Sequence, residues 1–163
     1  MSPNDHLPHV LVLPEDDADR ELANGFLLGI DERSLRQIQV LRPARGWAKV
    51  LSLFESEHVK EMDHRPNRYM VLLLDFDGDE KRLSKAKAVI PDHLSDRVFV
   101  LGVWSEPEDL KPDLGTPETV GSKLADNCRE ETDATWQHNL LRHNAVELDR
   151  LRQHVRPILF PSL

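Results

Sequence analysis

Three apolar runs in this chain are each followed closely by a cluster of acidic residues. The runs and the acids that follow them span residues 9–19, 69–80 and 97–109. Near-continuous apolar runs of this length are typical of strands that are buried on both faces, as in parallel sheets. In an open parallel sheet, ligands bind just outside the carboxyl ends of the strands. We therefore expect the three acid clusters to meet at one edge of a parallel sheet.

The acidity of the chain is concentrated in these clusters. The sequence has 29 Asp and Glu against 21 Lys and Arg, which gives a net charge of −8. The clusters hold 11 acidic residues and no Lys or Arg, and the rest of the chain would carry a net charge of +3. Many carboxylates in one place favour a hard divalent cation, because Mg²⁺ prefers oxygen ligands. Individual acids such as Asp79 and Asp109 have an alternative role, which is to cap helices.

The size and composition of the chain predict one globular domain. A length of 163 residues lies within the usual range for a single domain. No stretch has the 18 or more apolar residues of a membrane span, and the first residues lack the features of a secretion signal. The single cysteine, Cys128, excludes an internal disulfide and a cysteine-rich zinc site. We therefore expect a cytoplasmic protein that does not enter a membrane.

Strand and helix patterns alternate along the chain. Strands are predicted over residues 9–14, 37–41, 69–74 and 97–104. Helices are predicted over residues 17–29, 46–62, 80–89, 117–131 and 136–155, before an apolar tail at 157–161 that packs as a final strand or extension, or meets a partner. The predicted fold class is α/β, with a mostly parallel sheet flanked by helices. Within a single domain of residues 1–163, residues 9–110 would form the α/β core, and residues 116–163 a helical C-terminal extension and tail.

The order of the acidic motifs resembles the TOPRIM family, a metal-binding fold shared by topoisomerases, bacterial primases and the overcoming-lysogenization-defect nucleases. The family signature is a Glu after the first strand, usually in E-G-x-x-D, followed by D-x-D after a later strand. Here Glu15-Asp16-Asp17-Ala18-Asp19 supplies the first part and Asp75-Phe76-Asp77 the second, within a match over residues 9–110. Asp16 stands where the family usually has glycine, which brings the geometry of that turn into question.

Features that are missing from the sequence point to the nuclease branch of this family. The only tyrosine, Tyr69, begins the third predicted strand, so the nucleophile of a topoisomerase has no counterpart. The zinc-binding module of a primase is also absent. The resemblance therefore implies a small stand-alone nuclease of a kind often found in bacterial defence systems. Its expected activity is Mg²⁺- or Mn²⁺-dependent cleavage of a phosphodiester in DNA or RNA.

The resemblance also implies the residues of the site. The expected metal ligands are Glu15, Asp19, Asp75, Asp77, Glu106 and Glu108. Glu15 would act as a ligand or as a general acid–base, while Glu106 or Glu108 would complete a second site. Lys111 would neutralise charge that develops on the phosphate, although a lysine in a polar loop is more often a solvated surface residue.

Two other classes of function fit the same sequence. Residues 10–22 also resemble the start of a response-regulator receiver domain, in which Asp16 and Asp17 would hold Mg²⁺ and Asp75 or Asp77 would accept phosphate. A Ser/Thr switch and a strand-borne Lys-Pro are not found at receiver spacing after the fourth strand. The other class is a non-catalytic TOPRIM-like subunit that assembles with a larger protein partner or as a homo-oligomer.

Overall fold

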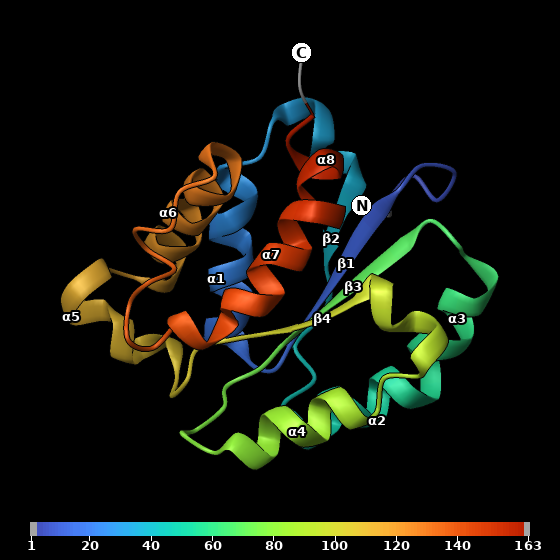
Figure 1. Cartoon of the computed structure of the whole chain (residues 1–163), viewed down its shortest axis with the longest axis horizontal. Helices are drawn as coiled ribbons and strands as arrows, with labels where there is room; N and C mark the ends of the chain where they lie inside the picture. The colour runs from blue at the N-terminus through green and yellow to red at the C-terminus, as the bar shows by residue number, and fades with distance from the viewer. Residues whose placement is uncertain (1–2, 162–163) are drawn as a thin grey trace.

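The computed structural model describes residues 3–161 and contains a parallel β-sheet between two layers of helices (Figure 1). Its strands are β1 (His9–Pro14), β2 (Ile38–Val40), β3 (Arg68–Leu73) and β4 (Val98–Leu101). They lie in the order β2-β1-β3-β4, and every neighbouring pair is parallel. The α/β fold class expected from the alternating pattern is therefore confirmed.

This strand order places a topological switch point between β1 and β3. The chain first adds β2 next to β1 on one side of that strand, and then crosses over to place β3 on the other side of β1. Pro14 pairs with Leu73 at the ends of the two strands, and the Glu15 amide donates to the Leu73 carbonyl at 2.9 Å. The residues that follow β1 and β3 therefore leave the sheet side by side, where open α/β sheets bind their ligands.

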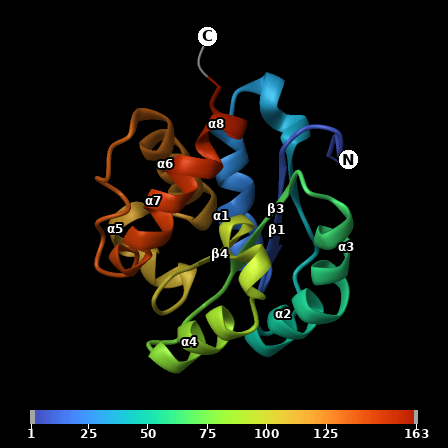
Figure 2. The same ribbon diagram turned by 45° about the vertical axis from the view of Figure 1, so that its right-hand side comes forward.

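Each face of the sheet is covered by its own set of helices (Figure 2). One face carries α1 (Asp17–Leu28), α6 (Pro117–Glu130), α7 (Ala145–His154) and α8 (Arg156–Leu159). The other carries α2 (Trp47–Leu53), α3 (Val59–His64) and α4 (Glu80–Ala88), with a π-helical segment, Phe54–His58, between α2 and α3. The remaining helical pieces are short: Glu32–Gln37, Asp92–Arg97, Pro107–Leu110, α5 (Lys111–Leu114) and Arg142–Asn144. Among residues 3–161, no helix has the length and apolar character needed to cross a bilayer.

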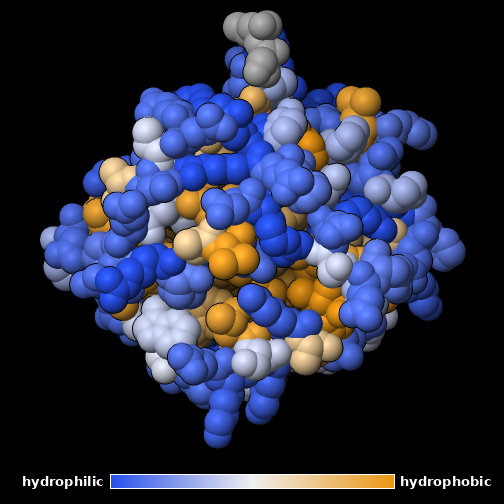
Figure 3. All heavy atoms as spheres, viewed as in Figure 1, coloured by the Kyte–Doolittle hydropathy of each residue, from blue (hydrophilic) through white to orange (hydrophobic). Residues whose placement is uncertain are grey.

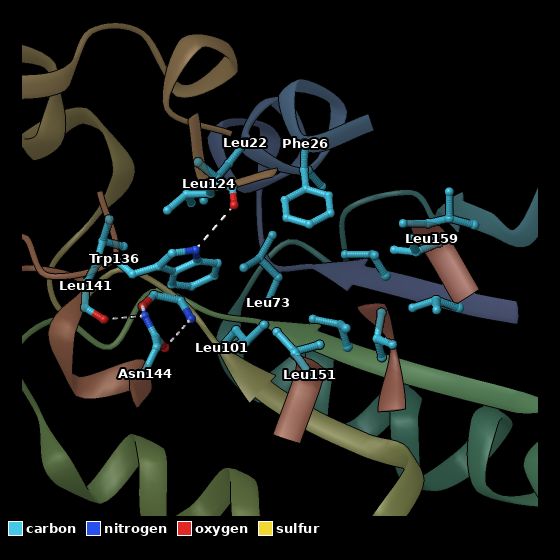
Figure 4. A pocket seen from close by; sticks show the side chains of 17 residues that line it. Leu22, Phe26, Leu73, Leu101, Leu124, Trp136, Leu141, Asn144, Leu151 and Leu159 are labelled. Atoms are coloured by element: carbon cyan, nitrogen blue, oxygen red, sulfur yellow. Dashed lines mark hydrogen bonds between the residues drawn. The ribbon is translucent and has the colours of Figure 1, made fainter. Parts of the chain in front are cut away.

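Alternate residues of each strand supply the two cores. Val10 and Val12 of β1 pack with α1, α6 and α7, whereas Leu11 and Leu13 pack with α2, α3 and α4. This alternation follows from the two-residue period of a strand. The first core retains a cavity of about 90 Å³ lined by apolar side chains (Figure 4).

Helices α1 and α6 approach each other closely through two glycines. A Cβ atom added at Gly25 would lie 2.0 Å from the Glu118 carbonyl oxygen, and one added at Gly121 would lie 2.0 Å from the Leu22 carbonyl oxygen. Only glycine leaves room for backbones at this separation. The two helices therefore pack backbone against backbone.

The helix predicted over residues 136–155 is wrong in its first half, because α7 begins only at Ala145. The Trp136 indole N–H donates to the Leu124 carbonyl at 3.3 Å, and the Leu140 carbonyl accepts from the Trp104 amide at 2.8 Å. These contacts hold the segment against α6 and the end of β4, so tertiary packing overrides local helical periodicity. Of the alternatives for the apolar tail, the structure shows a packed extension and not a strand: residues 156–159 form α8, and Phe160 is buried in the first core.

Side chains from the C-terminal segment cover the outer edge of β4. Asn144 accepts from the Gly102 amide at 3.2 Å and donates to the Gly102 carbonyl at 2.9 Å (Figure 4). The Arg150 guanidinium donates to the Val98 carbonyl at 3.3 Å and is held by Glu147 at 2.7 Å. On the face shown in Figure 3, apolar side chains gather between α7 and α4, over this edge. The hydrogen bonds from Asn144 and Arg150 occupy backbone groups of Gly102 and Val98 that would otherwise be free to pair with another strand.

We expect Asn144→Ala to lower the free energy of unfolding by about 3 kcal/mol, because it leaves the buried amide and carbonyl of Gly102 without partners. Urea unfolding followed by far-UV circular dichroism would measure the loss. Val146→Ala, at a side chain that is 68% exposed on α7, is the matched control and should change stability little. Equal stability of the two variants would contradict the role given to Asn144.

Candidate metal centre

Four carboxylate side chains meet at the carboxyl ends of β1 and β3. Glu15 and Asp16 follow β1 directly, Asp19 lies in the first turn of α1, and Asp75 comes two residues after β3. One oxygen from each of Glu15, Asp16 and Asp75 lies within 4.8 Å of the others. The carboxyl group of Asp19 is buried beside them and interacts with those of Asp75 and Asp16. We refer to these four side chains as the carboxylate cluster.

The local backbone fixes the positions of these side chains. Asp16 is the N-cap of α1, and its Oδ1 accepts from the Asp19 amide at 3.1 Å. The Asp16 backbone is extended, with φ −141° and ψ −172°, so this position does not need the conformational freedom of glycine. Glu15 Oε1 accepts from the Asp75 amide at 3.0 Å and so ties the end of β1 to the end of β3.

The cluster contains buried oxygens without a hydrogen-bond partner. Asp19 is 0% exposed, and neither of its carboxyl oxygens has a partner among residues 3–161. Asp75 is 7% exposed, and its Oδ1 is likewise unpaired within this part of the chain. Buried polar atoms are nearly always paired, so oxygens in such a place require either protons or a cation. The donor set, which consists only of carboxylate oxygens, fits Mg²⁺ or Mn²⁺.

The pKa values reflect the same crowding. Burial raises the pKa of Asp19, and the neighbouring Asp75 and Asp16 raise it further. Burial also raises the pKa of Asp75, and it raises the pKa of Glu15 against the opposing hydrogen bond from the Asp75 amide. For Asp16, burial acts in the same direction but is outweighed by hydrogen bonds at Asp19, so its pKa is lowered. Without a cation the cluster therefore retains protons, which a bound cation would displace.

Three of the metal ligands expected from the TOPRIM resemblance belong to the cluster, namely Glu15, Asp19 and Asp75. The fourth member, Asp16, was expected as a ligand only in the receiver alternative. Asp77 lies outside it: its side chain is 79% exposed, on a backbone with φ 51°, and lies 3.7 Å from Arg82. Although the sequence motif treats the two aspartates of D-F-D alike, the turn after β3 sends their side chains to different environments.

The third acid cluster, residues 106–109, lies beyond the carboxyl end of β4 but is not part of the carboxylate cluster. Glu106 and Glu108 are exposed, around the start of the helical turn Pro107–Leu110. Repulsion from Glu108 and Asp109 raises the pKa of Glu106, with smaller contributions from Asp77 and Asp16. Lys111 is exposed at the start of α5. Within residues 3–161, no hydrogen bond or ion pair joins these residues to the carboxylate cluster.

Two arginines that sequence reasoning missed lie next to the carboxylates. Arg82 of α4 donates through Nη1 to the Asp75 carbonyl at 3.0 Å. Arg45, in the loop after β2, donates to Asp17 at 2.9 Å, and its backbone amide donates to the Glu15 carbonyl at 2.8 Å. The one signal for Arg82 was its place in the first turn of the helix after D-F-D-G-D-E. Arg45 carried no comparable signal, because its position depends on the long-range pairing of the β2 loop with β1.

Nothing matches this chain in comparisons with protein-family models, with curated proteins and with solved structures. The fold and the carboxylate cluster are therefore the observations from which a function has to be argued.

Proposed function

We propose that the protein is a metal-dependent phosphodiesterase that cleaves nucleic acid, with Mg²⁺ or Mn²⁺ held by the carboxylate cluster. The observation that carries this proposal is the set of three buried carboxyl oxygens without a partner, two from Asp19 and one from Asp75, beside Glu15 and Asp16. Without a cation these oxygens depend on protons shared among the carboxyl groups, whereas a bound cation would coordinate them directly. Their place at the switch point of a parallel sheet, and the resemblance of the motifs to the TOPRIM family, support the same function.

Glu15 and Arg82 would have different roles in the cleavage of a phosphodiester. Glu15 keeps one oxygen on the Asp75 amide, so its other oxygen is available to a cation or a proton. Its pKa, raised by burial, suits a group that gives and takes a proton. Arg82, rather than Lys111, is the cation placed to offset charge on a phosphate beside Asp75. A bound divalent cation would polarise the phosphodiester and lower the pKa of a coordinated water.

Two observations favour this function over the receiver alternative. A phospho-acceptor aspartate must be reached by its donor, but Asp75 is almost fully buried. Asp77 is accessible but lies outside the carboxylate cluster. Neither aspartate therefore combines access with a place in the cluster.

The experiment that tests the proposed function is a cleavage assay with plasmid DNA, single-stranded DNA and RNA, in Mg²⁺, Mn²⁺ or EDTA. We expect cation-dependent cleavage by the wild type and a loss of at least about 100-fold in Asp75→Asn, whose amide cannot replace a carboxylate ligand. Asp109→Asn removes an acid outside the carboxylate cluster and should retain activity.

Equal cleavage by the wild type and Asp75→Asn would place the activity elsewhere. If the wild type binds Mg²⁺ in a thermal-shift titration but cleaves none of the substrates, the proposed function is wrong. That result would favour the non-catalytic subunit.

A further inference from the structure

A groove of about 670 Å³ lies between α2 and α4. These two helices cover the face of the sheet opposite α6 and α7 (Figures 1 and 2). Its lining includes Trp47, Leu51 and Ser52 from α2, and Lys85 from α4 with Val89 just beyond it. Trp47 is half-buried, so part of its indole remains accessible. The groove therefore has an aromatic wall, and its lining carries one cationic side chain, Lys85, and one acidic side chain, Glu55.

One guanidinium connects this groove to the carboxylate cluster. The Arg82 Cζ lies 5.1 Å from the centre of the Trp47 ring, while its Nη1 donates to the Asp75 carbonyl at 3.0 Å. The Lys85 Nζ lies 5.6 Å from the centre of the same ring. Arg82, which is not itself part of the groove lining, therefore links the Trp47 ring to Asp75 of the carboxylate cluster.

The charge of α4 indicates what kind of molecule this is. The helix carries four basic residues and a single acidic one, Glu80, within nine residues. Lys81 and Lys85 are exposed, and the Lys87 side chain is 49% exposed. In a protein with a net charge of −8, a basic helix beside a tryptophan complements an anionic, aromatic partner.

We propose that the groove binds a single strand of nucleic acid, with a base stacked on Trp47 and phosphates contacted by Lys85 and Arg82. Bases in a duplex are stacked on each other, whereas an unpaired base can lie flat against an indole. The proposal rests on the proposed function, because it assigns the path by which the substrate strand reaches the carboxylate cluster. It adds that the substrate is single-stranded near the cleavage site.

The test is the binding of short fluorescent single-stranded DNA, single-stranded RNA and duplex DNA, measured by anisotropy in EDTA so that cleavage does not interfere. We expect single strands to bind more tightly than the duplex. Trp47→Ala should weaken single-strand binding about 10-fold, and Trp47→Phe should retain most of the affinity because phenylalanine also stacks. Lys85→Gln should weaken binding and reduce its salt dependence, whereas Lys123→Gln on α6 should do neither.

The outcomes separate this inference from the proposed function. Binding that depends on Trp47 and Lys85, without cleavage of any substrate, would support the groove and refute the nuclease. Cleavage that depends on Asp75, with unchanged binding in Trp47→Phe, Trp47→Ala and Lys85→Gln, would overturn the groove alone. Tighter binding of the duplex would also overturn it. If Trp47→Ala fails to fold, the comparison of Lys85→Gln with Lys123→Gln still decides the result.

Discussion

Asp19→Asn is expected to raise the free energy of unfolding of the cation-free protein by up to about 4 kcal/mol near pH 7, and by almost nothing near pH 4. Burial raises the pKa of Asp19, so the folded protein keeps a proton that the unfolded chain releases above its ordinary pKa of 3.8. The folded state then binds more protons than the unfolded state, and each pH unit above that value lowers stability by about 1.4 kcal/mol. Asparagine has no such proton to retain. Urea unfolding in EDTA across this pH range measures the effect.

Adding Mg²⁺ is expected to raise the free energy of unfolding of the wild type more than that of Asp19→Asn. Cation binding displaces the retained protons and stabilises the folded state, and the variant has one carboxylate fewer to offer. Asp17→Asn is the control, because that side chain is 65% exposed and pairs only with Arg45 at the surface. A gain in Asp19→Asn that does not fade towards low pH, or an equal gain in Asp17→Asn, would contradict this account.

Gly121→Ala is expected to lower the free energy of unfolding by about 3 kcal/mol or more, and the melting temperature by about 10 °C. The new methyl group would lie 2.0 Å from the Leu22 carbonyl oxygen and 2.7 Å from the Phe26 nitrogen. Both are backbone atoms of α1, so neither can move aside without shifting the helix. Thermal unfolding followed by circular dichroism would measure the change.

Ser122→Ala is the matched control for this prediction. It introduces an alanine at the next position of α6 and removes only a hydroxyl group. Because alanine favours helices, this variant should be as stable as the wild type. A Gly121→Ala protein that melts together with Ser122→Ala would show that α1 and α6 are not held at the separation described here.

The sheet could be predicted from the sequence because its strands are short, apolar and buried on both faces. Residues 9–14 were predicted as a strand with the bounds that β1 has, and the other three strands lie within a residue or so of their predicted starts. The first half of the helix predicted over residues 136–155 was wrong, because contacts of Trp136 and Leu140 with distant parts of the chain decide its structure, whereas the second half is α7.

The candidate site was predicted in outline and in three of its members, Glu15, Asp19 and Asp75, but the expected ligands Asp77, Glu106 and Glu108 lie outside it. The sequence indicates that acids gather at the ends of β1 and β3, because parallel strands bring those ends together. It does not indicate which acid of each cluster faces inward. That choice depends on the N-cap geometry of Asp16 and on the left-handed backbone of Asp77, which are set by the turns rather than by the residue types.

The covering of β4 by Asn144 and Arg150 bears on what the smallest independent folding unit of this chain is. The motif-bearing stretch of residues 9–110 contains every strand and every carboxylate of the cluster, and so suggests a minimal enzyme. Yet its last strand would end in bare amides and carbonyls, and one face of its sheet would lose α6, α7 and α8. Such a fragment would expose unpaired backbone groups along one edge and apolar side chains on one face, and both favour aggregation. The part of the chain that carries the candidate site is thus smaller than the part that must fold to support it.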